Sequence, residues 1–599
     1  MRRRHVLPFG AEITPHGVQF RLWAPDAAAV SLQLERGPEF AMAAEGEGWF
    51  ALTTTQARAG SRYRYRIGEA CYPDPAARGQ PDGVFGPSEV VDPLAYDWSD
   101  GDWLGICWDQ AIIYELHVGA FSMAGDFIGV IHHLDDLMAL GVTLIELMPV
   151  AECPGRWNWG YDGVLPFAPA SRYGGPAGLK GLVDACHARG IGVILDVVYN
   201  HFGPEGNFLP AYARAFFTER HQTPWGAALN FDGEKAAPVR RFFIENALYW
   251  LEEYHLDGLR LDAVHAIIDD SPVPFLVELG QRVRRDLPDR PIHLIVENDR
   301  NDPTLLGHGQ GGPGPYDAQW NDDFHHALHV VLTGARDGYY ADYRDDPVGC
   351  LGRALAEGFT YQGELSRFRG ARRGASSVAL PTTAFVDFIQ NHDQIGNHAY
   401  GWRLAKFATE PALRAAAAIL LLSPAVPLLF MGEEWASDSP FPFFCDFAGD
   451  LAEAVRRGRL VEFADFTEFR DGPAQAKIPD ALAETTFLSA KLDWSQAGEA
   501  EHAEMLELYR YLTLLRHRHI DPLLGAGGGA GRFERFGARG LAVQWQFSSR
   551  KLRLVTNLDD RPAVGSPAET GQAIYRSHWI GEAVPPWFVA AYLDPPPGS

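Results

Sequence analysis

Hydrophobic and polar residues alternate with a period of two over the first part of the chain. Stretches such as GVQFRLWAP, AVSLQLE and SRYRYRIG repeat this alternation up to about residue 95, and turn residues separate them. Successive side chains of a strand point to opposite faces, so the pattern is typical of half-buried strands. We predict a small immunoglobulin-like β-sandwich over residues 1–95.

The pattern changes between about residues 110 and 440. Continuous apolar strands are buried on both faces, as parallel strands are. When such strands alternate with helical patterns over this length, they predict a (β/α)8 barrel of the α/β class, here over residues 96–495 with long loop insertions. Eight apolar runs carry the prediction: AIIYEL, GVTLIELMPV, GIGVILDVVYNH, DGLRLDAVH, IHLIVEN, DAQWND, TAFVDFIQNHD and VPLLFMGEE.

The last part of the chain combines one helical pattern with a second set of alternating runs. HAEMLELYRYLTLLRHRH has helical spacing, whereas GLAVQWQFS and KLRLVTNLD alternate as strands do. We therefore predict a C-terminal domain over residues 496–599, made of a helix and an antiparallel β-sandwich.

Composition and charge limit the classes of molecule that the protein is expected to bind. The formal net charge is −25, from 52 basic and 77 acidic residues. Such a field repels nucleic acid and anionic membranes and suits a neutral substrate. No apolar run of about 18 residues and no signal peptide is found. The six cysteines are far apart in sequence, which indicates free thiols in a reducing cytoplasm.

Four of the eight apolar runs end in residues suited to chemistry. In a barrel, the carboxyl ends of the strands form one face, where reactive side chains gather. A single aspartate at a strand end is more often a helix cap, but carboxylates from three strands would repel one another, which indicates a functional site. The residues at these ends are Asp196, Asn200 and His201; Arg260, Asp262 and His265; Glu297; and His392 and Asp393.

Arg260 and Asp262 are two residues apart on a strand and therefore point to the same face. The arginine lowers the pKa of Asp262 and keeps it charged, whereas apolar and negative neighbours raise the pKa of Glu297. Glycoside hydrolysis uses one charged and one protonated carboxyl group. Zinc binding by His201 and His392 is the weaker alternative, because no HExxH helix occurs.

These four segments together resemble the α-amylase superfamily, glycoside hydrolase family 13, over nearly the whole chain. The resemblance implies a retaining double displacement with Asp262 as nucleophile and Glu297 as acid/base. It implies no cofactor, and we expect no metal, because the loop that supports calcium near Asn200 in relatives is not recognisable. It makes Asp393 the third catalytic residue, which holds the hydroxyl groups of the distorted ring. The remaining role it implies is substrate binding by Arg260, His201, His392, Tyr161 and Asp162.

The segments DAVHAI, VENDRND and QWNDDFHHALH are similar to a subgroup of this family that releases trehalose. That resemblance implies malto-oligosyltrehalose as substrate, trehalose as product and a malto-oligosyltrehalose synthase as functional partner. A branching or debranching enzyme and a catalytically inactive glucan-binding protein are the alternatives. The candidates for contacts to the trehalose unit are Asp299, Arg300, Asn321, Asp322 and Glu364. His265 is a further candidate for substrate binding.

Overall fold

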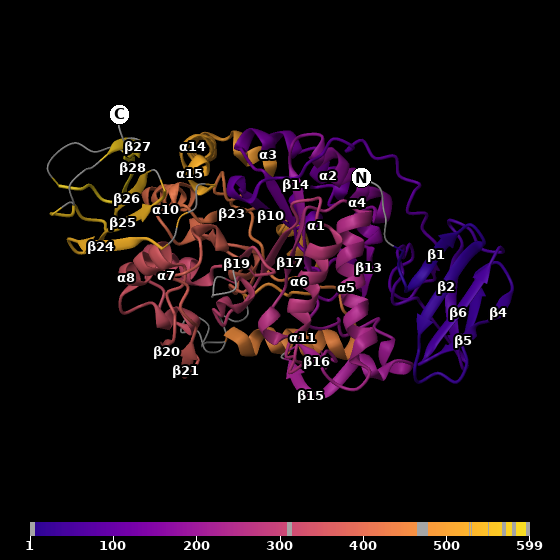
Figure 1. Cartoon of the computed structure of the whole chain (residues 1–599). Coiled ribbons are helices and arrows are strands. Elements are labelled where there is room, and N and C mark those ends of the chain that lie inside the picture. Colours follow the sequence, from indigo (N-terminus) through magenta and orange to yellow (C-terminus); the bar gives the residue numbers. More distant parts are fainter. Residues whose placement is uncertain are drawn as a thin grey trace.

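The computed structural model describes residues 6–223, 225–307, 314–463, 477–525, 528, 530–548, 550–565, 571–577 and 583–594. Its central part is a barrel surrounded by helices, with an N-terminal β-domain at one end of the molecule and a C-terminal sheet at the other (Figure 1). None of the described helices has the length and apolar character needed to cross a bilayer.

The N-terminal domain consists of two antiparallel sheets that pack face to face. One has the strand order β1-β2-β6-β5, and the other has the order β4-β3-β7-β8 with β9 added to β7. The rings of Phe20 and Tyr63 meet between them, 4.7 Å apart, which confirms the predicted sandwich. The strands are β1 (Gly10–Thr14), β2 (Gly17–Trp23), β3 (Ser31–Leu34), β4 (Glu39–Ala41), β5 (Ala43–Gly46), β6 (Trp49–Thr54), β7 (Arg62–Ile67), β8 (Ala70–Tyr72) and β9 (Ser88–Glu89).

Eight strands close into a parallel barrel, and they are the eight apolar runs seen in the sequence. Nearly every residue in them is buried, because side chains fill the inside and helices cover the outside. The predicted (β/α)8 barrel is confirmed. In barrel order, the strands are β10 (Ile113–Leu116), β11 (Leu144–Leu147), β14 (Gly192–Val197), β17 (Gly258–Leu261), β18 (His293–Val296), β19 (Ala318–Trp320), β22 (Phe385–Phe388) and β23 (Val426–Phe430).

The barrel interior changes from apolar to acidic side chains along the strands. Ile113, Leu144 and Ile194 belong to an apolar cluster inside the barrel. Two residues further along the same strands, on the same face, come Glu115, Glu146 and Asp196, each at most 2% exposed. Acidic side chains are therefore concentrated just below the carboxyl ends of the strands.

Helices surround the barrel, and a five-stranded antiparallel sheet follows them. The sheet has the order β24-β25-β26-β28-β27 and packs on α8 (Pro347–Glu357), where Gly352 is required because a Cβ there would lie 2.5 Å from the ring of Phe533. This confirms a C-terminal antiparallel β-domain, but its described strands form one sheet that packs on α8 and not the two sheets of the predicted sandwich. Its strands are β24 (Arg532–Phe536), β25 (Gly540–Gln546), β26 (Lys551–Asn557), β27 (Gln572–Arg576) and β28 (Phe588–Leu593); the main other helices are α4 (Gly175–His187), α5 (Ala236–Glu253), α6 (Phe275–Asp286), α7 (Asp322–Thr333), α10 (Glu410–Leu422) and α14 (Ala500–Leu515).

Candidate active site

A cleft of about 700 Å³ lies at the carboxyl ends of the barrel strands. Its volume is within the range of sites that hold small ligands. Most of the residues expected from the sequence line it, although they come from segments far apart in the chain. They are Tyr161, Asp162, His201, Arg260, Asp262, His265, Glu297, Asp299, Asp322, His392 and Asp393.

Arg260, on β17, joins the carboxylates below and around the cleft. Its Nη1 donates to Asp196 (2.6 Å) and to Asp262 (2.9 Å), and its Nη2 donates to Glu297 (2.8 Å). The guanidinium carbon also lies 4.0 Å from the ring centroid of Trp320. A planar fork with several donors can hold three carboxylates at once, which a single ammonium cannot do. Arg260 therefore holds Asp262 and Glu297 close to each other, and both line the same cleft.

Asp262 is held in its charged form. Burial would raise its pKa, but Arg260 and a hydrogen bond from Asn200 Nδ2 (2.8 Å) outweigh burial, so the pKa lies below its usual value. An ionised carboxylate at the floor of a cleft can attack an electrophilic carbon or stabilise positive charge.

The pKa of Glu297 is shifted in the opposite direction from that of Asp262. Burial raises its pKa, Arg260 opposes the rise, and the charges of Asp262 and Asp393 add to it, so the pKa lies well above its usual value. Its Oε2 accepts from Arg260 and from the backbone N–H of Ala263 (2.8 Å). Because Oε2 already accepts two hydrogen bonds, the proton of the neutral Glu297 carboxyl group belongs on Oε1, from which it can be donated. Ala263 reaches this oxygen in a left-handed backbone conformation, with φ of 41°.

The sugar-binding residues expected from the sequence surround this pair. The ring of Tyr161 stacks on that of His392 at 5.2 Å. Asp393 lies beside His392 in the chain, and its Oδ1 accepts from Asn397 (2.8 Å). Burial lowers the pKa of His201 below its usual value, although Asp262 and Asp162 oppose this. This wall therefore offers an aromatic face, a carboxylate and imidazole groups to a ligand.

A second set of polar residues lines another part of the cleft. Asp299 accepts from Arg369 (2.7 Å) and lies 3.6 Å from Nδ1 of His265. Burial raises the pKa of Asp322 to about 7, although Arg373 opposes the rise. These side chains offer both donors and acceptors in one region.

Three residues expected at the site do not line the cleft, and for each we correct the expectation. Asn321 is buried below it, where its side chain caps α7 and donates to Asp387 (2.8 Å). Glu364 is exposed and pairs with Arg353. Arg300 is exposed beyond the end of β18. A strand-end asparagine that caps the next helix is the common structural case, and here it applies.

Several lining residues were not found from the sequence. Trp225, Tyr343, Phe368 and Arg369 come from turns and loops outside the barrel strands, and Arg373 comes from the short strand β21 (Ala371–Arg373). They follow no periodic pattern, so nothing local in the sequence distinguishes them from other loop residues.

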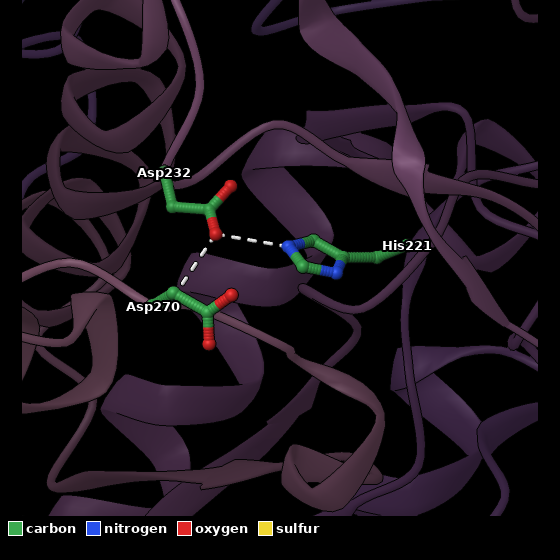
Figure 2. Close-up of side chains that lie close together, drawn as sticks. All are labelled: His221, Asp232 and Asp270. Carbon is green, nitrogen blue, oxygen red and sulfur yellow. Dashed lines mark hydrogen bonds and ion pairs between the residues drawn. The ribbon is translucent and has the colours of Figure 1, made fainter.

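One group of side chains among the described residues has metal-ligand types at short range: His221, Asp232 and Asp270 (Figure 2). Asp232 Oδ2 already accepts from His221 (2.9 Å) and from the backbone N–H of Asp270 (3.0 Å). Arg220 pairs with both carboxylates, at 3.1 and 3.7 Å. The group is therefore balanced by a side-chain cation, and it lies outside the cleft lining.

Sequence comparison decides the family. The malto-oligosyltrehalose trehalohydrolase of Saccharolobus solfataricus is 40% identical over 86% of this chain and 87% of its own length. The proteins of the same name from Deinococcus radiodurans (43% identical, 86% and 83% covered) and Arthrobacter ramosus (41%, 92% and 95%) are also similar. The chain belongs to the malto-oligosyltrehalose trehalohydrolase family.

The domain matches agree with membership of this trehalohydrolase family. The α-amylase catalytic domain matches residues 70–225, carbohydrate-binding module 48 (isoamylase N-terminal domain) matches 8–94, and a domain of unknown function matches 528–587. A crystal structure described as a putative α-amylase from Salmonella typhimurium is 44% identical, covers 99% of this chain and all of that chain, and has a TM-score of 0.94. A pullulanase from Paenibacillus barengoltzii, 20% identical with 99% and 96% covered and a TM-score of 0.72, shares the fold. The resemblance to the α-amylase superfamily is confirmed.

Proposed function

We propose that this chain is a retaining glycoside hydrolase that cleaves the α-1,4 bond next to the terminal trehalose of malto-oligosyltrehalose and releases α,α-trehalose. One observation carries the chemical part: Asp262 and Glu297 share Arg260, yet their pKa values are shifted in opposite directions. The substrate is supported by the names of relatives that are 38–43% identical.

The charge states of Asp262 and Glu297 indicate which step of the reaction each residue carries out. Glu297 donates its proton to the glycosidic oxygen while the Asp262 carboxylate bonds to the anomeric carbon, so the bond to trehalose breaks and a glycosyl–enzyme ester forms. Glu297 then removes a proton from water, which attacks the same carbon and frees Asp262. Asp393 accepts hydrogen bonds from the ring hydroxyls. Both carboxyl groups contact one guanidinium, which suits the short separation, about 5–5.5 Å, of retaining enzymes.

We assign the trehalose side of the cleft to His265, Asp299 and Asp322. Trehalose and maltose differ in where the last hydroxyl groups point. A wall built from buried polar groups rejects the wrong sugar, because that sugar leaves those groups without partners. Arg300, Asn321 and Glu364 are not part of this proposed site, because they do not line the cleft.

Product analysis tests the proposal. Purified protein is incubated with malto-oligosyltrehalose and, separately, with a maltodextrin of equal length, and the products are separated by chromatography. We expect free trehalose from the first substrate, slow cleavage of the second and no products from Asp262→Ala. New branched chains would instead favour a branching enzyme, a function named in a relative from Corynebacterium jeikeium that is 28% identical over 71% of this chain. Binding without products would favour a glucan-binding protein.

A synthase that supplies the α,α-1,1-linked substrate and a cytoplasmic location stay predictions. The required substrate chemistry supports the first, because a malto-oligosaccharide end must be rearranged before trehalose can be released. The cysteines support the second: all six are free thiols.

A further inference from the structure

A buried glutamate that the proposed chemistry does not use lies directly beneath the cleft. Glu115 is on β10, faces the barrel interior and is 1% exposed. Both of its oxygens contact one residue of the site: Oε2 accepts from the backbone N–H of His392 (3.2 Å) and Oε1 lies 2.5 Å from Nδ1 of the same histidine. Glu115 is not among the residues that line the cleft, and its hydrogen bonds connect it to the cleft through His392.

The hydrogen bonds around His392 fix where its protons are. Tyr161 donates its hydroxyl proton to Asp196 Oδ2 (2.7 Å), an oxygen that also accepts from Arg260. The same hydroxyl oxygen lies 2.9 Å from His392 Nε2. A hydroxyl has one proton, so the proton in this second contact belongs to Nε2. Nδ1 faces a carboxylate, so it carries a proton as well.

We propose that Glu115 is a positioning residue that holds His392 as a doubly protonated cation at the floor of the cleft. The cation donates to the oxygen of Tyr161, which orients that ring, and it balances negative charge beside Asp393. The inference deepens the proposed function and rests on it for the activity measurements below.

The other charges near His392 agree with this assignment. Burial lowers the pKa of His392, but Glu115 and then Asp393 raise it and Arg260 opposes them, so the pKa lies above 6.5. His117, which follows β10, does not compete as a cation, because burial lowers its pKa to about 3. With the charge of Glu115 removed, burial and Arg260 would dominate, and His392 would lose a proton at neutral pH.

The neighbouring strand supplies a matched control. Glu146 on β11 is the register partner of Glu115 and is equally buried. Burial, followed by the charge of Glu115, raises the pKa of Glu146 well above its usual value, which favours its neutral form. Neither of its oxygens has a hydrogen-bond partner among the described residues. Glu146→Gln therefore changes neither a charge nor a contact of His392.

The test compares pH profiles of kcat/KM. In Glu115→Gln, the amide oxygen can still accept from Nδ1, but the charge is lost. We expect this variant to stay within about 3-fold of wild type at pH 5 and to be at least about 10-fold weaker at pH 8, as a histidine pKa lowered by one unit or more requires. Glu146→Gln should follow the wild-type profile. In a His392→Gln background, Glu115→Gln should add no pH-dependent loss. An equal loss at every pH, or no loss, would overturn the proposal.

A second measurement does not depend on activity. In protein labelled with ¹⁵N-histidine, His392 is identified as the signal that His392→Gln removes. At pH 7.5 both of its ring nitrogens should show imidazolium shifts in wild type and in Glu146→Gln, and neutral-ring shifts in Glu115→Gln. A neutral ring in wild type would refute the role of Glu115 whatever the substrate is. An imidazolium in a protein that releases no trehalose would refute only the proposed function.

Discussion

Replacing Arg260 with lysine keeps the positive charge but removes the fork that joins the carboxylates. The guanidinium makes three charge-assisted hydrogen bonds, of 2.6, 2.9 and 2.8 Å, and is 1% exposed. An ammonium at this position can keep about one of them. Each lost bond costs about 1.5–3 kcal/mol, so losing two costs about 3–6 kcal/mol. If that loss falls on the transition state, kcat/KM drops by about 10²–10⁴-fold.

The assay is trehalose release from malto-oligosyltrehalose, with thermal unfolding of each variant as a check on folding. Arg516→Lys is the control, because Arg516 is also fully buried but donates to the backbone carbonyls of Ser423 and Ala425 (both 2.7 Å), away from the cleft. We expect both variants to unfold at lower temperature. Only Arg260→Lys should lose activity beyond about 3-fold. If folded Arg260→Lys keeps wild-type kcat/KM, the shared guanidinium does not determine the positions and charge states of the two carboxyl groups, and the reasoning is wrong.

Three further changes test other parts of the molecule. Glu297→Gln should lower kcat/KM about 10²–10⁴-fold on malto-oligosyltrehalose but far less on a glycosyl fluoride, whose leaving group needs no proton; equal losses on both would speak against Glu297 as the acid. Asp322→Ala should raise cleavage of plain maltodextrin relative to that of the trehalosyl substrate, and an unchanged ratio removes Asp322 from the trehalose side. His187 lies 3.0 Å from both Asp100 and Asp257; burial lowers its pKa, but these two acids more than offset burial and raise it above 6.5. A raised folded-state pKa gives stability that is complete below about pH 6.5 and lost as pH rises through the folded pKa. His187→Gln should therefore lower Tm more at pH 6 than at pH 9, and equal shifts at both would contradict the assignment.

The barrel and the catalytic pair were predictable because both follow from strand periodicity. Apolar runs buried on two faces mark the strands, and a period of two places Arg260 beside Asp262, as the 2.9 Å contact confirms. Carboxyl ends of barrel strands converge, which brings Glu297 to the same arginine.

The predictions of single site residues failed where helix capping or the path of a loop decides the position of a side chain. Asn321 ends a strand as the catalytic residues do, yet its side chain turns down to cap α7. Trp225 and Phe368 reach the cleft from loops, whose paths no periodic pattern records. Glu115 was visible as a charged residue inside the apolar run AIIYEL. A charge in a strand buried on both faces requires a buried partner. That partner, His392, follows β22 and lies 277 residues away in the sequence.

The anomeric form of the first product tests the central claim most directly. ¹H NMR of the wild-type reaction with malto-oligosyltrehalose is recorded in the first minutes, before mutarotation mixes the anomers. With Asp262 as nucleophile and Glu297 as acid and base, α,α-trehalose should appear together with a malto-oligosaccharide whose new reducing end is α. A β reducing end would mean that water attacks directly, and it would contradict the paired roles assigned to the two carboxyl groups on Arg260.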